Sequence, residues 1–350
     1  MGNKIKIAAV QMDCTPDTVS KRLARAAGLI AEAANDGAEL IVLPELFNTG
    51  YEYHERNYAL AETIDGQTVT WMKAQAAHHN IHLAGTLLLL DETDIYNAAP
   101  LVAPDGRMWR YDKMYVPLWE RAYFRGGQQI TVADTDLGKL GMMICWDQAH
   151  PDLWKQYAGQ VDAIVIMSCP GNLGTADLVF PDGFRGKFME LGGQQPDNYS
   201  LENNSDNDTN DRHRQAAWMK VPVVSASATG TIRTNVPLLE GTLGQSPFAD
   251  RIAQASETLL EAWFEPETQI IDANGETLAQ GTAIGDGIVF ADVELADVAP
   301  SLSETTQPTI NIPPDIYHVS DEAIPSMMIP LYKDGVRRQW GQDMAPDELQ

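Results

Sequence analysis

The feature that most constrains the fold of this chain is the alternation of short apolar runs with segments of helical spacing. Residues 4–11 and residues 39–43 are runs of strand length that read as buried strands. Between them, apolar residues recur at steps of three and four residues: Val19, Leu23, Ala26 and Ile30. This spacing is typical of one buried face of a helix. The alternation therefore predicts a mixed α/β domain.

Turn signals divide much of the remaining chain into further elements. Thr15 followed by Pro16 predicts the start of the first helix, because proline is favoured at the first helical position. A helix over residues 68–77 is expected to lead into one strand over residues 81–90. Hairpins are predicted at residues 95–102 with 108–112, 130–133 with 141–144, and 269–273 with 277–279.

Two segments lack this alternation. Residues 181–212 are polar, turn-forming and poor in apolar side chains, so they are predicted to form an exposed loop. A lid or an oligomer contact is the alternative interpretation of this segment. Beyond Pro300 the chain is rich in proline and is expected to be irregular, with a short amphipathic end at residues 332–340.

Reactive side chains follow three of the apolar runs. Glu45, Lys113 and Cys145 each come just after a predicted strand, and Glu120 lies seven residues beyond Lys113. Substrates bind at the carboxyl ends of strands in open α/β sheets, and a nucleophile there sits on a sharp, exposed turn. A thiol, two carboxylates and an amine in such positions suit covalent attack on an amide carbon.

The segments that carry these side chains, residues 40–47, 111–120 and 141–148, resemble in order the motifs of the carbon–nitrogen hydrolase family. This family is the nitrilase superfamily of amidases, carbamoylases and nitrilases, and the resemblance extends from about residue 4 to about residue 295. It implies an α-β-β-α sandwich, in which two stacked mixed sheets are flanked by helices. It also implies a carbon–nitrogen hydrolase domain over residues 1–300. Residues 301–350 would then be a C-terminal extension that packs on a partner subunit, in a homodimer or higher homo-oligomer.

The resemblance also implies a catalytic role for each of the four side chains. Cys145 would be the nucleophile and Glu45 the base that takes its proton. Lys113 would stabilise the developing oxyanion together with the backbone N–H of Trp146. Glu120 would orient the lysine and contact the leaving nitrogen. The chain departs from the family at Asp112, where a basic residue commonly precedes the lysine.

Each of these residues also has a structural interpretation. A lone cysteine is often an inert core thiol, because free cysteine is among the most buried residue types. Glu45 could cap a strand end, and Lys113 could be an ordinary lysine at the end of a hairpin. Glu120 and Arg121 could form a plain surface ion pair. The occurrence of all the motifs in one chain favours the catalytic interpretation.

Three aromatic residues beside the motifs, Tyr51, Trp119 and Trp146, are predicted to bind substrate by shaping the acyl pocket. The residue two positions after the nucleophile is Asp147, where nitrilases of the family typically have Glu and amidases and carbamoylases typically have Asp. The expected reaction is therefore hydrolysis of a linear non-peptide amide or an N-carbamoyl amine through a cysteine acyl-enzyme. A nitrilase is the second interpretation, and a catalytically silent oligomeric binding protein is the third.

The charge and cysteine content limit the partners of the protein. The net charge of −25 argues against nucleic acid and anionic membranes as partners. The resemblance implies a small-molecule amide or carbamoyl substrate as the partner. The three cysteines have no paired spacing, and no signal-peptide core precedes the first strand, which favours a cytoplasmic protein. His78, His79 and His82 lack acidic or cysteine partners and more readily form an exposed helix end than a metal site. No cofactor and no metal are implied.

Overall fold

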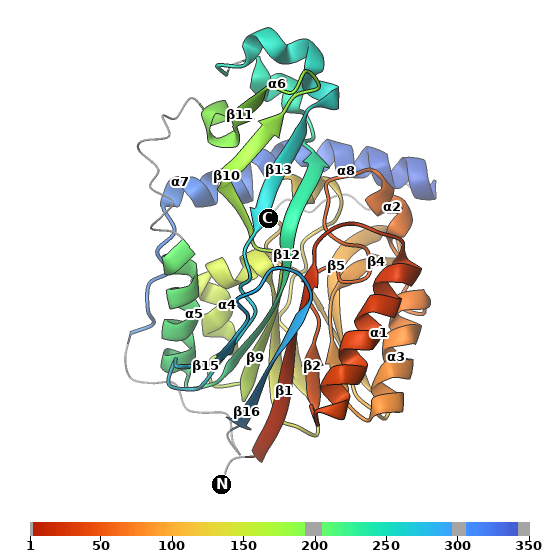
Figure 1. The fold of residues 1–350 in the computed structure, drawn as a ribbon, viewed down its shortest axis with the longest axis vertical. Coiled ribbons are helices and arrows are strands. Elements are labelled where there is room, and N and C mark those ends of the chain that lie inside the picture. Colours follow the sequence, from red (N-terminus) through yellow and green to blue (C-terminus); the bar gives the residue numbers. More distant parts are fainter. Residues whose placement is uncertain (1–2, 193–204, 245, 296–305, 342–350) are drawn as a thin grey trace.

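Two β-sheets stacked between outer layers of helices form the body of the molecule (Figure 1). The coordinates are those of a computed structural model, and the structure describes residues 3–192, 205–244, 246–295 and 306–341. This arrangement of two sheets between layers of helices confirms the predicted α-β-β-α sandwich.

The first sheet is built around the N-terminal strand β1. Its strands are β16 (Gly287–Leu295), β1 (Asn3–Asp13), β2 (Leu40–Val42), β3 (His82–Ala84), β4 (Leu87–Asp91), β5 (Asp94–Val102) and β6 (Met108–Asp112). Strands β1, β2 and β3 are parallel, whereas β16 runs antiparallel to β1. The single strand predicted over residues 81–90 is wrong, because Gly85 and Thr86 separate β3 from β4.

The second sheet carries the strand that leads to the candidate nucleophile. Its strands, in spatial order, are β7 (Val132–Asp134), β8 (Lys139–Ile144), β9 (Ala163–Ser168), β12 (Val223–Asn235), β14 (Gln269–Ile271) and β15 (Thr277–Gln280). A short parallel pairing between β1 and β12, at Met12 with Ala228, joins the two sheets.

Alternation along β1 explains why apolar side chains fill both of its faces. Ile5 and Ile7 lie in the core between the two sheets, whereas Ala8 and Val10 lie in the core beneath the helices on the outer face. Successive side chains of a strand point to opposite faces, so a strand covered on both sides is apolar throughout. The same reason accounts for the continuous apolar run that the sequence shows there.

Helices cover the outer faces of both sheets. On the first sheet lie α1 (Val19–Asn35) and α3 (Gln67–His79), and on the second lie α4 (Pro151–Tyr157) and α5 (Ser205–Met219). Helix α1 begins at Val19, so the start predicted at Thr15 and Pro16 is wrong. The N–H of Asp17 donates to the carbonyl of Thr49, which holds this segment against the loop that follows Glu45.

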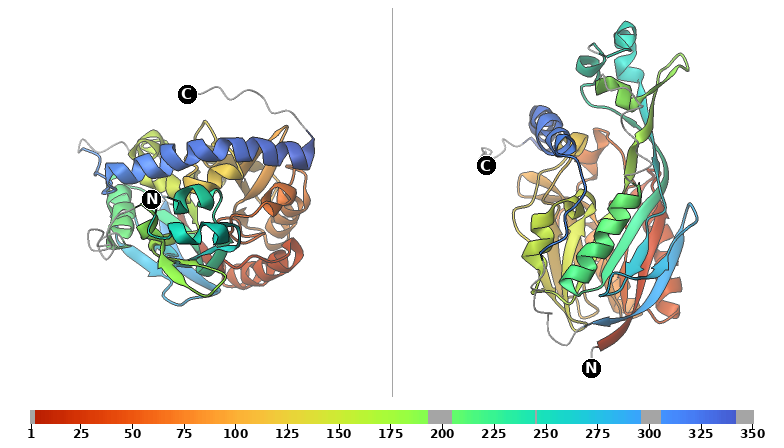
Figure 2. Two further views of the ribbon diagram at one scale, coloured as in Figure 1. Left: turned by 90° about the horizontal axis from the view of Figure 1, so that it is seen from above. Right: turned by 90° about the vertical axis from the view of Figure 1, so that its left-hand side faces the viewer.

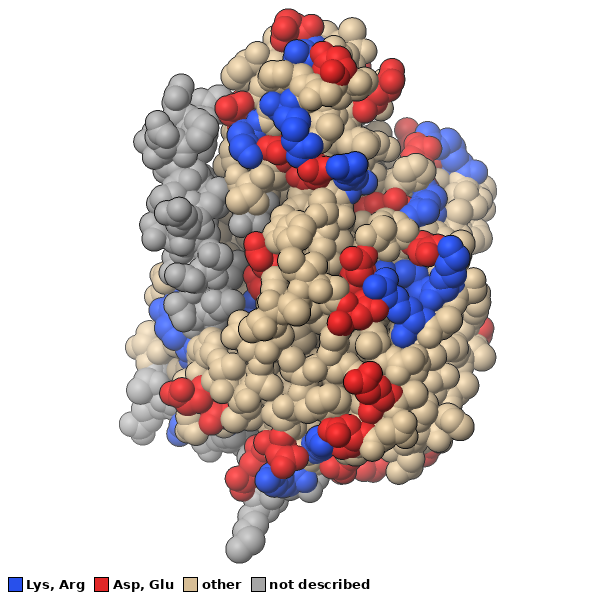
Figure 3. All heavy atoms as spheres, viewed as in Figure 1, with Lys and Arg blue, Asp and Glu red and all other residues tan. Residues whose placement is uncertain are grey.

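A four-stranded arm extends from one end of the sandwich, at the top of Figure 1. It consists of the distal half of β12 with β13 (Leu259–Phe264), β10 (Gly171–Val179) and β11 (Arg185–Lys187), together with η3 (Phe188–Gly192), α6 (Leu239–Leu243) and η6 (Ala249–Glu257). Basic and acidic side chains are interspersed on the arm in Figure 3. Within the arm, Arg185 pairs with Asp177 and Glu261. The arm therefore offers mutually compensated charges rather than a surface of one sign.

The exposed loop predicted over residues 181–212 is wrong in its described parts. It contains β11, η3 and the first turns of α5, while residues 193–204 lie outside the described residues. The buried face of α5 is polar over part of its length: Arg212 is buried in an ion pair with Glu267, and the side-chain amide of Gln215 donates to the carbonyl of Pro308 at 2.9 Å. Apolar side chains, among them Ala216 and Met219, enter the core only near the end of the helix, so apolar periodicity is limited to its last turns.

The C-terminal extension folds back over its own chain. It forms α7 (Pro314–Tyr317), the π-helical turn η7 (His318–Ala323) and α8 (Ile324–Trp340), so a mostly irregular tail was the wrong expectation. Figure 2 shows α8 end-on beside the arm, at the same end of the sandwich. Tyr332 is buried, its hydroxyl donates to Asp94 at 3.0 Å and it accepts the N–H of Ile95 at 2.8 Å. Packing of the extension on a partner subunit stays a prediction.

Candidate active site

Glu45 lies just beyond the end of β2, in a turn whose geometry is fixed by its neighbours. Leu46 has a positive φ of 48°, and its N–H donates to the hydroxyl of Thr86 at 2.8 Å. Thr86 lies where the strand is interrupted between β3 and β4, and its hydroxyl accepts this hydrogen bond there. The Glu45 side chain is buried, and its carboxylate accepts three hydrogen bonds: from Lys113 at 2.9 Å, from the Asn97 amide at 2.7 Å and from the N–H of Cys169 at 2.9 Å.

Lys113 joins the two predicted carboxylates. It follows β6, its backbone N–H donates to the carbonyl of Asn97 at 2.9 Å, and its ammonium donates to Glu45 at 2.9 Å and to Glu120 at 2.6 Å. Although burial disfavours the charged form, the carboxylates of Glu120 and Glu45 raise the pKa of Lys113 well above its usual range. The ammonium is therefore a fixed positive charge.

Glu120 is buried in the short helix η1 (Leu118–Ala122). Its carboxylate accepts Lys113 on one oxygen and the hydroxyl of Tyr51, at 2.5 Å, on the other. Burial raises the pKa of Glu120 to about 7, against the lowering influence of Lys113. The interpretation of Glu120 and Arg121 as a plain surface pair is wrong, because Glu120 is only 3% exposed. Asp112, the departure from the family pattern, pairs instead with Arg110.

Cys145 occupies a strained turn between β8 and the short helix η2 (Cys145–Ala149). Its φ is 49°, a left-handed conformation that non-glycine residues adopt rarely and at a cost of about 1–3 kcal/mol. The thiol lies 3.8 Å from the carbonyl of Cys169. Strain of this kind persists only where the surrounding structure fixes the turn.

Asp147 fixes the inner side of that turn. Its fully buried carboxylate accepts the N–H groups of Ile144 at 2.9 Å, Met114 at 3.1 Å and Tyr115 at 2.8 Å, and the hydroxyl of Tyr111 at 2.7 Å. Burial nevertheless raises the pKa of Asp147 to about 6. Because these donors come from the segments on either side of Lys113 and from the strand before Cys145, one carboxylate ties the lysine loop to the nucleophile turn.

The electrostatic environment of Cys145 favours a resting thiol. Burial raises its pKa well above the usual range, the Glu45 carboxylate raises it further, and the Lys113 ammonium acts in the opposite direction. A thiolate would therefore form only as a base accepts its proton. The three charged side chains that influence this thiol most are Glu45, Lys113 and Glu120.

The three aromatic residues predicted to bind substrate lie in different environments. Tyr51 is buried and donates to Glu120. Trp119 is buried between the ring of Tyr53, at 5.7 Å, and the ring of Phe188 from the arm, at 5.4 Å. Trp146 is half-buried, and its indole N–H donates to Asp321 of the C-terminal extension at 2.7 Å. The substrate-binding role of all three stays a prediction.

Sequence reasoning missed Asn97 and Tyr53, and for Cys169 it left open whether the side chain lines the pocket or only packs in it. Asn97 sits in the middle of the apolar strand β5, and a buried amide in such a strand signals a hydrogen-bonded site. Cys169 directly follows β9 and holds Glu45 through its backbone N–H. The Tyr53 hydroxyl lies 3.2 Å from that of Tyr51. No sequence signal marks Cys169 or Tyr53, because Cys169 acts through its backbone N–H and Tyr53 acts through the hydroxyl of Tyr51.

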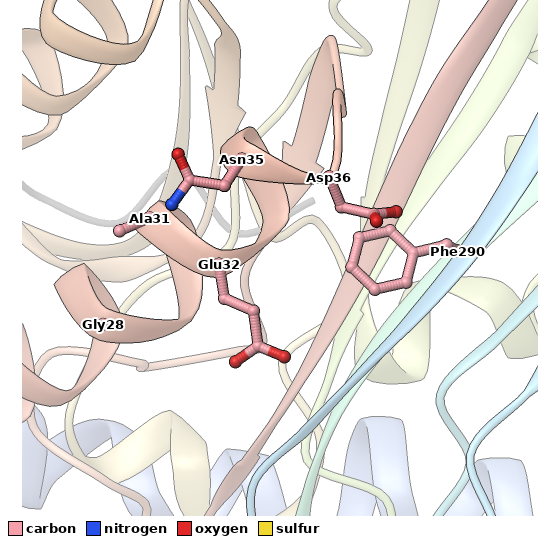
Figure 4. Close-up of a pocket in the computed structure, with 6 residues that line it drawn as sticks. All are labelled: Gly28, Ala31, Glu32, Asn35, Asp36 and Phe290. Carbon is pink, nitrogen blue, oxygen red and sulfur yellow. The ribbon is translucent and has the colours of Figure 1, made fainter.

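Other parts of the described chain offer less chemistry. No group of three or more His, Cys, Asp or Glu among the described residues could hold a metal ion. Within the same ranges, no helix has the length and apolar character needed to cross a bilayer. The surface hollow in Figure 4 is lined by α1 and Phe290 of β16, and it contains none of the four candidate catalytic side chains.

Comparison with known proteins places these residues in context. The model of the family described as carbon–nitrogen hydrolase matches residues 6–179, a range that includes all four candidate catalytic residues. A nitrilase from Pyrococcus abyssi is 32% identical over 173 residues, which cover 48% of this chain and 65% of that protein. A citrullinase from Francisella tularensis is 27% identical over 304 residues, covering 84% of this chain and 90% of that protein.

Solved structures share the architecture. A carbon–nitrogen hydrolase from Helicobacter pylori G27 superposes with a TM-score of 0.63 at 20% identity, covering 84% of this chain and 90% of that chain. At this identity the likeness concerns the fold alone.

Proposed function

This chain belongs to the carbon–nitrogen hydrolase family, and from that premise we propose that it hydrolyses a linear non-peptide amide or an N-carbamoyl amine through a covalent intermediate on Cys145. The observation that carries the proposal is the buried Glu45–Lys113–Glu120 cluster, whose charges act on the Cys145 thiol. Buried charges are costly to maintain, so a cluster of three beside a strained cysteine favours catalysis over structural support.

In the first half-reaction, the Sγ atom of Cys145 attacks the carbonyl carbon as its proton passes to Glu45. A C–S bond forms and the carbonyl oxygen becomes negative. The tetrahedral intermediate then collapses, the C–N bond breaks, and Glu45 returns the proton to the departing nitrogen. The product on the enzyme is a thioester from an amide, or a thiocarbamate from a carbamoyl substrate.

In the second half-reaction, water attacks the acyl carbon while Glu45 accepts a proton, and cleavage of the C–S bond restores the thiol. The oxyanion forms twice, and the Lys113 ammonium with the backbone N–H of Trp146 would stabilise it each time. Glu120 and Tyr51 keep the ammonium in place through the bonds at 2.6 Å and 2.5 Å. Preorganised charge of this kind needs no rearrangement during the reaction.

The choice among substrates rests on two further observations. The Asp147 carboxylate accepts four hydrogen bonds in a fully buried site. A Glu at this position would have to fit one more methylene group into that site. One relative, 90% of whose length is covered by the match to this chain, is a citrullinase, and citrulline is an N-carbamoyl amine. Both support an amide or carbamoyl substrate. The likeness to a nitrilase supports nitrile hydrolysis as the second candidate.

A substrate panel tests the proposal. Purified protein is incubated separately with citrulline and other ureido compounds, with aliphatic amides and with the matched nitriles, and ammonia is measured. We expect ammonia from at least one amide or ureido compound, more slowly from any nitrile, and none from Cys145→Ala. Cys14→Ala is the matched control, because it removes a buried thiol that has no role in the proposed reaction, and it should retain activity. Preferential turnover of nitriles would favour the second candidate, and no turnover in the panel would favour a silent binding protein.

A further inference from the structure

We propose that Asp321, in the C-terminal extension, is a positioning residue for the Cys145 nucleophile, so that the extension completes the active site within its own chain. The inference rests on the proposed role of Cys145. It assigns a functional contact to a segment whose sequence is proline-rich and was expected to be irregular.

Asp321 contacts the nucleophile turn directly. Its Oδ1 atom accepts the indole N–H of Trp146 at 2.7 Å, and its Oδ2 atom lies 3.4 Å from Nε2 of His150. Trp146 is the residue after Cys145, and His150 is the residue after the end of η2. One carboxylate therefore contacts side chains at both ends of the turn that presents the thiol.

Aromatic contacts surround this carboxylate. The Tyr317 hydroxyl donates to the carbonyl of Ala149 at 2.5 Å, and its ring lies 5.4 Å from His150 and 6.1 Å from Trp146. The ring of His150 also stacks on Tyr115, with ring centroids 3.4 Å apart. These contacts hold the outer side of η2 between the extension and the segment that follows Lys113.

The local backbone explains how Asp321 reaches the turn. Residues 318–323 form a π-helical turn between α7 and α8, and such turns are uncommon and frequently occur at functional sites. The π-helical turn changes which side chains of the extension face η2. Within it Asp321 faces Trp146 and His150, whereas the neighbouring Glu322 is exposed and pairs with His318 in the same turn.

The turn is thus fixed from two sides, by Asp147 on its inner side and Asp321 on its outer side. Cys145 is held at a positive φ of 49°, which relaxes if its surroundings loosen. Small displacements of a nucleophile are expensive, since a misplacement of about 1 Å can cost on the order of a hundredfold in rate. Removal of Asp321 should therefore slow the attack step without removing any group that reacts.

The test compares three variants of the full chain. Asp321→Ala removes both contacts, and we expect kcat to fall by about tenfold with KM within about twofold of wild type. Asp321→Asn keeps an oxygen that can accept the indole N–H of Trp146, so it should restore kcat to within about threefold. Glu322→Ala is the matched control, because it removes a neighbouring carboxylate that does not touch η2, and it should behave as wild type.

A second measurement does not need turnover. The rate at which 2-chloroacetamide alkylates Cys145, followed by peptide mass spectrometry, should fall by a similar factor in Asp321→Ala and recover in Asp321→Asn. Trp146→Phe deletes the same hydrogen bond from the other side, and combining it with Asp321→Ala should add little further loss. If wild type shows no turnover but the rate of Cys145 alkylation still depends on Asp321, the proposed reaction is rejected and the positioning role stands. Unchanged kcat and alkylation in a folded Asp321→Ala, or equal losses in Glu322→Ala, would overturn the positioning role.

Discussion

The charged cluster and the C-terminal extension meet the nucleophile turn in different ways. Lys113 and Glu45 have 0% side-chain exposure and depend on each other's charge, whereas Asp321 is 22% exposed and contacts an indole and an imidazole. Loss of one partner in a buried ion pair leaves an uncompensated charge, at a cost of about 3–5 kcal/mol. Loss of charge at Asp321 should matter little if an acceptor remains. The comparison separates a region where charge is required from one where geometry is required.

The largest expected effect is that of Glu45→Gln, which removes a charge and a proton acceptor with almost no change of shape. We expect kcat to fall on the order of a hundredfold or more, since general acid–base catalysis contributes about that much. The exposed Glu32→Gln on α1 is the control. Activity of Glu45→Gln within a few-fold of wild type would show that charge is no more required at Glu45 than at Asp321.

A second effect concerns pH. With a pKa of about 7, Glu120 gains a proton below neutrality and then binds the Lys113 ammonium less strongly. The rate constant kcat/KM should therefore rise about tenfold per pH unit up to about pH 7 and level off above it. Glu120→Gln should be slower at neutral pH and should lack this limb. An acid limb near the ordinary carboxyl range in the wild type would show that burial does not control this group.

The two aspartates whose carboxylates fix the inner and outer sides of the nucleophile turn, Asp147 and Asp321, allow a matched comparison. Asp147→Asn replaces an oxygen that accepts N–H and O–H donors with an amide that donates, so at least one buried donor loses its partner. We expect a loss of about 1–3 kcal/mol in the free energy of unfolding, measured by denaturant titration, with reduced kcat. Asp321→Asn should change the same free energy by less than about 0.5 kcal/mol. Equal losses in the two variants would show that the inner and outer contacts are equivalent.

The smallest effect on catalysis should come from Tyr332→Phe, far along the extension from η2. The change removes the hydroxyl that accepts the Ile95 N–H and donates to Asp94, so the free energy of unfolding should fall by about 1 kcal/mol. The kinetic constants should remain within about twofold, because Tyr332 does not touch the nucleophile turn. A tenfold fall in kcat would mean that the whole extension, rather than Asp321, positions the thiol.

The sequence pattern was sufficient to predict a mixed α/β domain because the buried strands are apolar on both faces, whereas the α-β-β-α sandwich was implied by the resemblance to the carbon–nitrogen hydrolase family. The strands place Glu45 and Lys113 together, and Lys113 contacts both Glu45 and Glu120 in the structure. Their catalytic roles stay predictions. Strand patterns carry this information because burial and backbone pairing act locally on each run.

The remaining features depend on contacts between distant segments. The buried face of α5 is partly polar because Arg212 pairs with Glu267, so apolar periodicity is limited to the last turns of the helix. Helix α8 contains Pro330 and still continues, because Met328, Tyr332 and Val336 are buried against the rest of the chain. Asp321 meets Trp146 across 175 positions of sequence. No local pattern records such a pairing.

The identity of the nucleophile is the central claim, and trapping the covalent intermediate tests it most directly. Wild-type protein is quenched with acid during turnover of a slow amide or ureido substrate, digested, and analysed by peptide mass spectrometry. The account predicts an acyl or carbamoyl mass addition on the peptide that carries Cys145, absent from Cys145→Ala and unchanged in Cys14→Ala. An adduct on Cys14 or Cys169, or turnover that survives in Cys145→Ala, would contradict it.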